Sequence, residues 1–401
     1  PVLKHSRFAA KLRAGRYRRA PQGLRCRSSL RPGAVGQGGA SSLIFALLEE
    51  LLLLRLFLWF WVYLFLLDCY CGWAGDWLSA VVCSRLGSGF EETLVMRIVF
   101  MGTPDFAVPS LTSLVAAGNE IALVVTRPDA VRGRGKKLEP SPVKAKALEL
   151  GLPVFEANRM TPEVVEALQD AQADIFCVAA YGCILPDEVL HMAPLGIVNV
   201  HASLLPRWRG AAPIQRAILA GDEVAGVSIM RIGHGVDTGA YCAQASTSVA
   251  SKHAEALTME LGELGGKLLA DTLPSFADGT AVWTEQDEAL VTHAAKISKQ
   301  EMRLDPQMTA LDCVRHVLAS SDTAPARCVI AGKTVRVLDA APADVTLGEG
   351  QVLVQAKRVY LGLSDGAVEL LEVKPDGKRA MAASAWAAGL QGSDLTWGVL
   401  S

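Results

Sequence analysis

The alternation of short apolar segments with helix-like patterns between residues 97 and 268 constrains the fold more than any other feature. The apolar segments are hydrophobic at nearly every position, which is typical of strands buried on both faces of a parallel sheet. Helical patterns fill the intervals, and Gly118 and Gly151 end two of them. We predict strands at Arg97–Met101, Ile121–Thr126, Val154–Phe155, Asp174–Ala180, Gly196–Val198 and Gly226–Ile232. The pattern predicts an α/β domain with a doubly wound, mostly parallel sheet.

The pattern changes after residue 300. One amphipathic helix, Ala310–Leu318, precedes several closely spaced short strands, and Asp-Gly turns such as Ser364–Gly366 and Pro375–Gly377 separate them. Such spacing is typical of a small β-barrel. Residues 281–300 are polar and mixed, which indicates a linker. We therefore predict a catalytic domain over 96–280, a linker over 281–300 and a small β domain over 301–401.

Residues 1–95 differ from the rest in charge and hydropathy. They hold 12 Lys and Arg against 6 Asp and Glu, whereas the whole chain holds 39 and 41. Residues 43–67 are apolar, but Arg55 lies near their middle, where a charge is costly in a bilayer. Met96 stands directly before the first predicted strand. We interpret residues 1–95 as an upstream translation artefact, and a membrane anchor or a transit segment as the alternatives.

A polar pair follows the apolar segment Gly196–Val198. Asn199 and His201 are two residues apart, so on a strand their side chains project to the same side, at the carboxyl edge where ligands bind in open α/β sheets. Acyl transfer needs a donor for an oxyanion and a group that moves protons, and an amide and an imidazole supply these. Asp237, in the glycine-rich loop Gly233–Gly239, is the candidate for a third, carboxylate group.

A second candidate site is the long loop Arg127–Pro142. Flexible loops of this length inside a compact domain are often functional, although charge runs also occur as plain solvated surface. A basic loop near the carboxyl edge is suited to grip the phosphates of a polyanion such as RNA. Its basic residues are Arg127, Arg132, Arg134, Lys136 and Lys137.

Other chemistries are not indicated. The turn Gly102–Asp105 after the first strand is not a G-x-G-x-x-G fingerprint, and no P-loop occurs, so nicotinamide and nucleoside triphosphate chemistry have no sequence support. The nine cysteines are scattered, without a Cys-x-x-Cys pair or zinc spacing. We expect reduced thiols in a cytosolic protein and no metal.

Residues 96–401 resemble the methionyl-tRNA formyltransferases over essentially their whole length. The Asn-x-His-x-Ser-Leu-Leu-Pro motif and the downstream Asp occur more widely in enzymes that use 10-formyltetrahydrofolate. Within that class, three features narrow the resemblance to the tRNA enzymes. They are Gly102–Ala107, the loop Gly133–Lys137 with Pro140–Lys144, and Arg207–Gln215. The C-terminal part resembles the family by length, by Lys296–Lys299 and by strand pattern.

The resemblance implies a Rossmann-like formyltransferase domain followed by an OB-like, tRNA-binding domain. It implies formyl transfer from 10-formyltetrahydrofolate to the methionine amine of initiator methionyl-tRNA, for translation initiation, with no metal. Asn199, His201 and Asp237 would be catalytic, and the basic loop, Arg134 above all, would hold the tRNA acceptor end. The expected folate-site residues are Ser203, Leu204, Leu205 and Pro206. We further expect a cytoplasmic monomer without DNA partners and without stable membrane association of residues 96–401.

Two alternatives remain open. A formyltransferase that acts on a small amine, such as a ribonucleotide or an amino sugar, would use the same motif but would lack the basic loop and the trailing β domain. A membrane-tethered RNA-binding protein with an inactive catalytic fold would have lost one of Asn199, His201 or Asp237, and all three are present.

Overall fold

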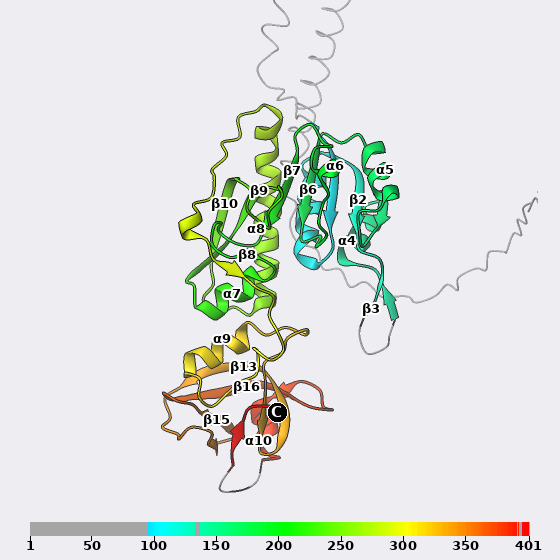
Figure 1. Ribbon diagram of the computed structural model, residues 1–401. Helices are drawn as coiled ribbons and strands as arrows, with labels where there is room; N and C mark the ends of the chain where they lie inside the picture. The colour runs from blue at the N-terminus through cyan, green and yellow to red at the C-terminus, as the bar shows by residue number, and fades with distance from the viewer. Residues whose placement is uncertain (1–94, 133–136, 391, 393–394, 401) are drawn as a thin grey trace, which may run out of the picture. The chain divides into compact units, whose positions relative to one another are not determined.

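The computed structural model describes residues 95–132, 137–390, 392 and 395–400 (Figure 1). Our interpretation of residues 1–95 as an artefact, an anchor or a transit segment concerns residues outside this range, apart from Val95. The same holds for Arg134 and Lys136 in the basic loop. Among the helices that the structure does describe, none is long and apolar enough to cross a membrane.

The predicted catalytic domain, residues 96–280, is built on one seven-stranded sheet with the order β10-β9-β7-β6-β1-β2-β5. Its strands from β7 to β5 pair in parallel, whereas β9 runs antiparallel to β7, and β10 antiparallel to β9. The predicted doubly wound, mostly parallel sheet is thus confirmed. The strands are β1 (Arg97–Gly102), β2 (Glu120–Thr126), β5 (Val154–Glu156), β6 (Ile175–Ala179), β7 (Ile197–His201), β9 (Val224–Arg231) and β10 (Tyr241–Ser248).

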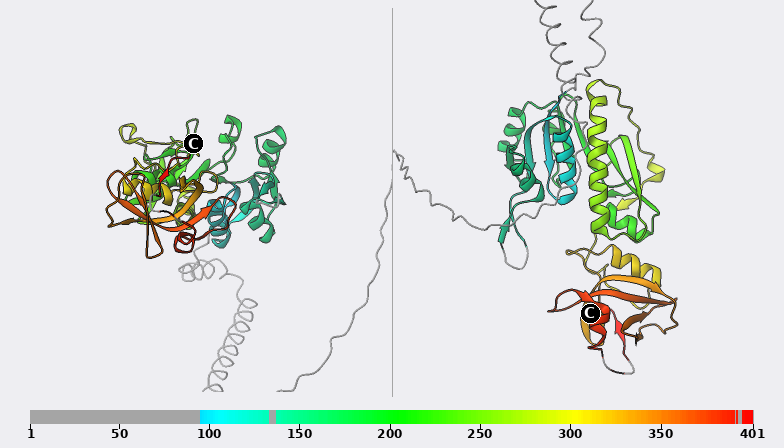
Figure 2. Two further views of the ribbon diagram at one scale, coloured as in Figure 1. Left: turned by 90° about the horizontal axis from the view of Figure 1, so that it is seen from below. Right: turned by 180° about the vertical axis from the view of Figure 1, so that it is seen from behind.

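Helices cover both faces of this sheet, which explains why its central strands are apolar at successive positions (Figures 1 and 2). In β1, Ile98 and Phe100 belong to one buried cluster, and Val99 and Met101 belong to the other. The first cluster includes residues of α3 (Val108–Ala116), α4 (Pro142–Glu149), α7 (Pro213–Ala220) and α8 (Ala254–Ala277). The second includes residues of α5 (Pro162–Asp170) and α6 (Asp187–Leu190).

Two parts of the catalytic domain differ from the sequence prediction. Strand β10 was not predicted, because on this edge strand small and polar residues alternate and no continuous apolar run marks it. The loop Arg127–Pro142 contains a short antiparallel hairpin, β3 (Ala130–Arg132) with β4 (Lys137–Glu139), where we expected an irregular loop. The backbone of a hairpin is satisfied by its own pairing, so its side chains can remain exposed.

The C-terminal part is an antiparallel sheet with the order β14-β15-β16-β13-β12-β18, accompanied by α9 (Ala310–Leu318). This confirms the predicted OB-like β domain, and the helix has the predicted bounds. The Asp-Gly turns lie between strands, as expected. The remaining elements are β12 (Arg327–Ile330), β13 (Lys333–Ala343), β14 (Val352–Gln355), β15 (Arg358–Gly362), β16 (Ala367–Pro375), β17 (Met381–Ala382), α10 (Ala383–Ala387) and β18 (Trp397–Gly398).

The polar segment that follows α8 runs back along the catalytic domain. Thr284 forms an isolated bridge with Tyr241, and the short strand β11 (His293–Ala294) pairs in parallel with β8 (Arg209–Gly210). A short 3-10 turn, η2 (Glu288–Leu290), lies between these contacts. The segment is held by backbone pairing and polar side chains. Such contacts require no regular spacing of apolar residues. The sequence of this segment therefore gave no sign that it packs against the domain, and we predicted a linker.

Candidate active site

Asn199 and His201 are the last residues of β7 that face one side of the sheet. Asn199 lies opposite Val178 of β6 and Met230 of β9, so it is flanked on both sides by paired strands. The side chain of His201 is only 5% exposed, whereas Asn199 is half-buried. Within the described part of the chain, no hydrogen bond occupies the Asn199 amide. Its N–H groups are thus available to an oxygen that enters the site.

The backbone carbonyl of Trp208 fixes the orientation of the His201 ring. His201 Nε2 lies 3.0 Å from the Trp208 carbonyl oxygen. Because a carbonyl oxygen can only accept a hydrogen bond, Nε2 must carry the hydrogen. Nδ1 is then the ring nitrogen that faces the site. Nδ1 lies 3.6 Å from Oδ2 of Asp237, which the structure therefore brings to His201 from a separate loop. This separation is slightly too long for a direct hydrogen bond and permits an ionic contact once the ring is protonated.

The loop after β9 holds Asp237 in a fixed position. Its backbone has φ +52°, in the left-handed region that aspartate tolerates better than most residues. Oδ2 accepts a hydrogen bond of 2.9 Å from the backbone N–H of Gly210. Gly239 must be glycine here, since a Cβ at this position would collide with the carbonyl oxygen of Arg231. The side chain of Asp237 remains 19% exposed, so it is both held and accessible.

The predicted folate loop is stabilised by a buried polar network. The Ser203 hydroxyl donates to the carbonyl oxygen of Arg207 at 2.6 Å. The Ser228 hydroxyl donates to the Ser203 carbonyl oxygen at 2.7 Å and accepts from the Leu205 N–H at 3.1 Å. Gln244 donates to the Leu205 carbonyl oxygen at 2.9 Å. Ser203 and Leu205 are buried, and these bonds fix the path of the chain directly after His201.

The other two residues predicted for the folate site are less enclosed. Leu204 and Pro206 are half-buried, and the Leu204 side chain lies against Gly226 of β9. A folate role for the four residues stays a prediction. The structure places all of them in the loop that follows β7.

The position of Trp208 is fixed by three residues whose role the sequence did not predict, namely Arg207, Asp222 and Thr292. The guanidinium of Arg207 lies 4.4 Å from the centre of the Trp208 ring and binds Asp222 through two hydrogen bonds of 2.6 and 2.9 Å. These bonds to Asp222 raise the pKa of Arg207. The Trp208 indole donates to Asp222 at 2.8 Å, and the Trp208 backbone N–H donates to Thr292 at 2.9 Å. Trp208 is held at φ +64° and directs its carbonyl toward His201.

The basic hairpin is anchored at its base by charged contacts. Arg127 donates to the carbonyl oxygens of Tyr181 and Gly182. Lys144, which was not predicted, pairs with Asp129 and Glu156 at 2.6 Å each, and these hydrogen bonds raise its pKa. The single positive charge of Lys144 is thus shared between a carboxylate at the hairpin base and one at the end of β5.

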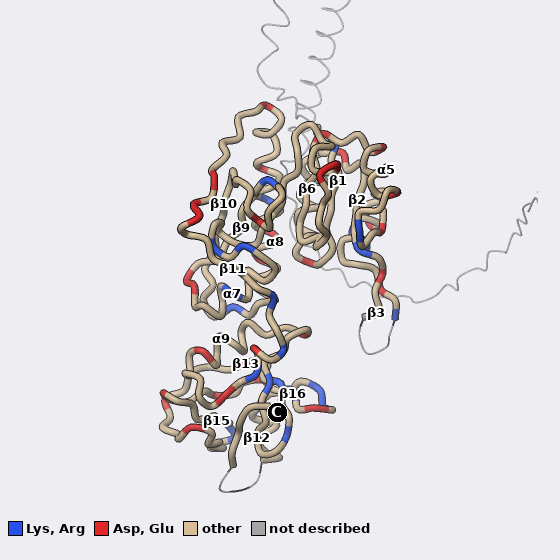
Figure 3. The backbone as a smooth tube through the Cα atoms, in the orientation of Figure 1, with Lys and Arg blue, Asp and Glu red and all other residues tan. Residues whose placement is uncertain are grey.

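The described end of the hairpin presents Lys137 and an exposed apolar pair. Arg132 and Lys137 lie opposite each other in the β3–β4 register, directly before and after the four residues at the tip that the structure does not describe. Figure 3 shows Lys and Arg positions, in blue, along the backbone near β3. Val131 and Leu138, the adjacent pair, are 61% and 66% exposed. The hairpin therefore offers charge and apolar surface together to a partner.

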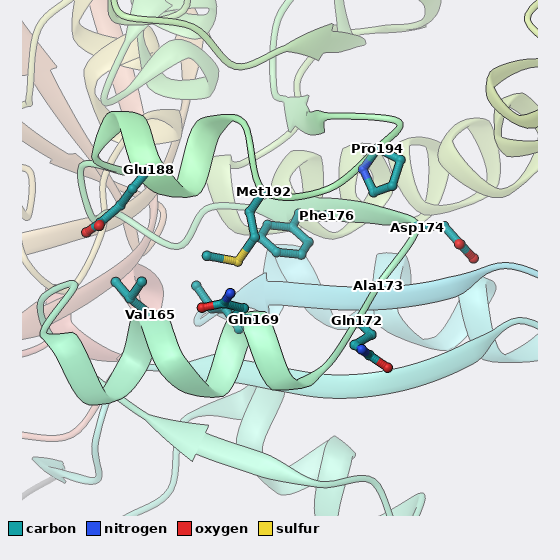
Figure 4. Close-up of a pocket in the computed structure, with 10 residues that line it drawn as sticks. Val165, Gln169, Gln172, Ala173, Asp174, Phe176, Glu188, Met192 and Pro194 are labelled. Carbon is teal, nitrogen blue, oxygen red and sulfur yellow. The ribbon is translucent and has the colours of Figure 1, made fainter.

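Two hollows accompany the catalytic domain. One, of about 470 Å³, lies after β5 and β6 at the carboxyl edge and is lined by Asn158, Arg159, Met160, Gly182, Cys183, Ile184 and Pro186. The other, of about 590 Å³, lies between α5 and the α6 region, with Val165, Gln169, Glu188 and Met192 around Phe176 (Figure 4). Neither hollow is lined by any of the three predicted catalytic residues. The first lies at the same sheet edge as these residues.

Together these groups form a site suited to acyl transfer. It holds an amide donor on Asn199, an imidazole whose Nδ1 faces inward, and a carboxylate on Asp237. Over the described residues, no group of three or more His, Cys, Asp or Glu side chains has the arrangement of a metal site.

Residues 96–273 match the formyl transferase family, and residues 296–391 match its C-terminal domain. The chain is 45% identical over 295 residues to a methionyl-tRNA formyltransferase from Methylococcus capsulatus, a match that covers 72% of this chain and 95% of the relative.

Solved structures share the fold at low sequence identity. HypX from Aquifex aeolicus in complex with tetrahydrofolic acid is 18% identical, with a TM-score of 0.54 over 75% of this chain and 50% of HypX. This chain thus spans about half the length of HypX. An N-formyltransferase from Helicobacter canadensis in complex with folinic acid and dTDP-3-aminofucose is 15% identical, with a TM-score of 0.53 over 69% of this chain and 99% of that one. The matches of both domains, and the identity over most of a curated relative, show that this chain belongs to the formyltransferase family.

Proposed function

We propose that this protein transfers the formyl group of 10-formyltetrahydrofolate to the amino group of methionine on initiator methionyl-tRNA, which gives N-formylmethionyl-tRNA for translation initiation. The observation that carries the proposal is the convergence of Asn199, His201 and Asp237 at one sheet edge. This site lies in a chain that matches a methionyl-tRNA formyltransferase over 95% of that relative's length.

The first step is attack of the methionine amine on the formyl carbon. The electron pair of the formyl C=O moves to its oxygen, and the amide N–H of Asn199 stabilises the resulting oxyanion. A preorganised donor of this kind contributes on the order of 100- to 1,000-fold to the rate. The unoccupied amide of Asn199 at the end of β7 supports this role.

The second step is removal of a proton from the amine nitrogen. Asp237 accepts it, directly or through Nδ1 of His201. Once protonated, Nδ1 donates to the oxyanion or to the carboxylate. The oxyanion's electron pair then re-forms the C=O bond as the bond between the formyl carbon and N10 of the folate breaks, and N10 takes up the proton that Asp237 or His201 had accepted from the amine. The commitment of His201 Nε2 to the Trp208 carbonyl supports Nδ1 as the active atom.

Two features support a folate co-substrate. The loop Ser203–Pro206 follows the catalytic strand β7, and the hollow at Asn158–Met160 and Gly182–Pro186 lies beyond the neighbouring strand β6. Both are at the carboxyl edge, where ligands bind in sheets of this type. We propose that the folate lies between them, with its formyl group toward Asn199.

Two further features support a tRNA acceptor over a small amine. The hairpin exposes Lys137 and an apolar pair beside the site's sheet edge, and the relative matched over 95% of its length is a methionyl-tRNA formyltransferase. An exposed basic and apolar hairpin is not needed to hold a small amine. All groups of the site come from one chain, so we propose a monomer, and we place it in the cytoplasm with the other components of translation.

The test is formylation of charged initiator tRNA by 10-formyltetrahydrofolate carrying a labelled formyl group. We expect label on the methionine amine, and much slower transfer to an amino sugar nucleotide or to glycinamide ribonucleotide. If one of these small amines were labelled rapidly while the tRNA acquired no label, the proposal would be overturned in favour of the small-amine alternative.

A further inference from the structure

Gln286, in the polar segment after α8, contacts the backbone that carries the catalytic carboxylate. Its side-chain amide donates to the carbonyl oxygen of Asp237 at 2.9 Å and to that of Gly239 at 2.7 Å. Both hydrogens of one NH₂ group are therefore used on the two ends of a three-residue turn. Gln286 is 9% exposed, so these bonds form where water does not compete freely.

The other end of the Gln286 amide is held as well. Its oxygen accepts a hydrogen bond of 2.8 Å from Nε of Arg209, whose side chain is 5% exposed. Arg209 also pairs with Glu288 at 2.8 Å, and this bond lowers the pKa of Glu288. The amide cannot flip without placing its oxygen against two carbonyl oxygens and its NH₂ group against a guanidinium. Its orientation is thus unambiguous.

The same segment also reaches the groups that orient His201 and Asp237. Thr292 accepts from the Trp208 N–H, and the carbonyl of Trp208 receives the His201 hydrogen. The backbone oxygen of Ala294 lies against Gly210, whose N–H binds the Asp237 carboxylate. Gly210 has φ +125°, and a Cβ there would lie 2.8 Å from that oxygen, so the close approach requires glycine.

We propose that Gln286 is a positioning residue for formyl transfer: it fixes the turn Asp237–Gly239 so that the Asp237 carboxylate stays directed at His201. It touches no reacting atom in this arrangement and acts through Asp237. The inference rests on the proposed function, because it assigns to Gln286 an effect on that reaction.

The position of Gln286 explains why backbone support is needed. Asp237 lies in the left-handed region within a loop containing Gly233, Gly235 and Gly239, and such a loop has many alternative conformations when released. A displacement of about 1 Å at a catalytic group can reduce the rate on the order of 100-fold. Substrate affinity should depend less on the position of the Asp237 carboxylate, since we propose that the folate and the tRNA bind to other residues.

The test compares Gln286→Ala and Gln286→Glu with the matched control Glu285→Ala in the full chain. Glu285 is exposed, adjacent in sequence, and has no hydrogen bond among the described contacts of its side chain. Gln286→Glu retains an oxygen that can accept from Arg209, but it places a carboxylate oxygen against the two backbone carbonyl oxygens. This variant therefore keeps the contact with Arg209 and removes the contacts with the turn. The measurements are kcat and KM for both substrates, per folded molecule, with Tm determined in parallel.

We expect kcat to fall about 10- to 100-fold in both Gln286 variants, with each KM within about 3-fold of wild type. Glu285→Ala should retain the wild-type kcat. A Gln286→Glu protein that is folded and has the wild-type kcat would overturn the inference, even if Gln286→Ala fails to fold. A lower Tm with unchanged kcat would show a purely structural role. Absence of tRNA formylation by the wild-type protein would instead count against the proposed function.

Discussion

His201 donates its Nε2 hydrogen to the carbonyl oxygen of Trp208 at 3.0 Å, and this bond turns Nδ1 toward Asp237. The carbonyl is itself held, because the Trp208 indole and the Arg207 guanidinium both bind Asp222. The Trp208 carbonyl, which takes no part in the reaction itself, thus determines that Nδ1 is the ring atom of His201 that faces the site. A second group of contacts holds the backbone of Asp237, where the Gln286 amide donates to the Asp237 carbonyl oxygen.

The first prediction concerns the tautomer of His201. In its neutral form the ring should carry hydrogen on Nε2, because the Trp208 carbonyl can only accept. His191 and His316 are internal controls, since each donates Nδ1–H to a backbone carbonyl four residues earlier at 2.8 Å. Two-bond hydrogen–nitrogen correlation spectra distinguish the two forms. His201 in the same tautomer as His191 would contradict the assignment.

The second prediction concerns the basic hairpin. Lys137→Gln should raise the KM for tRNA several-fold and reduce the slope of log affinity against log salt by about 1, because one phosphate contact is lost. KM for the folate should not change. Arg134→Leu, at the undescribed tip, should act in the same direction.

The control for the hairpin is Lys267→Gln on α8, a lysine whose side chain is 73% exposed and pairs with Asp271. It removes the same charge from a surface that we do not assign to tRNA. Equal effects of Lys137→Gln and Lys267→Gln would show that only the net charge of the protein matters.

The third prediction concerns alkaline pH. Cys177 in β6 is fully buried, and burial raises the pKa of its thiol. Above about pH 8.5 the unfolded chain loses this proton and the folded protein keeps it, so the folded state binds more protons. The free energy of unfolding should then fall by about 1.4 kcal/mol per pH unit for this group. The stabilisation is complete below that pH and is lost as pH rises.

Cys177→Ala isolates this contribution. The variant should be about 1 kcal/mol less stable than wild type at pH 7.5, because packing is lost. The difference should narrow or reverse by pH 10, since alanine does not titrate. Urea unfolding at the two pH values measures it, and the buried thiols of Cys313 and Cys328 contribute equally to both proteins. A constant difference between the proteins would contradict the assignment.

Much of the fold was predictable because it follows from local patterns. The apolar strands, the Pro and Gly positions at helix ends, and the Asp-Gly turns each encode an element within a few residues. The pair Asn199 and His201 was predictable because strand alternation fixes which side chains share a face. Asp237 could be proposed as the carboxylate because it lies in a glycine-rich loop directly after a predicted strand.

The supporting contacts were not predictable from the sequence. Gln286 reaches the turn at Asp237 over a long sequence separation, and a single glutamine in a polar segment has no pattern that distinguishes it. The Trp208 carbonyl is a backbone group, and any residue carries one. Strand β10 was missed because an edge strand with exposed polar residues lacks an apolar run. In each case the deciding interaction is tertiary, so it leaves no local pattern.

The most direct test of the central claim is the single-turnover rate of formyl transfer to initiator methionyl-tRNA by Asp237→Asn, with both substrates saturating. Asparagine also tolerates the left-handed backbone and retains an oxygen for the Gly210 N–H, so the variant should fold with an unchanged Tm. We predict a rate about 100- to 10,000-fold below wild type, because the proton acceptor is lost. A folded Asp237→Asn protein that transfers formyl at the wild-type rate would contradict the account.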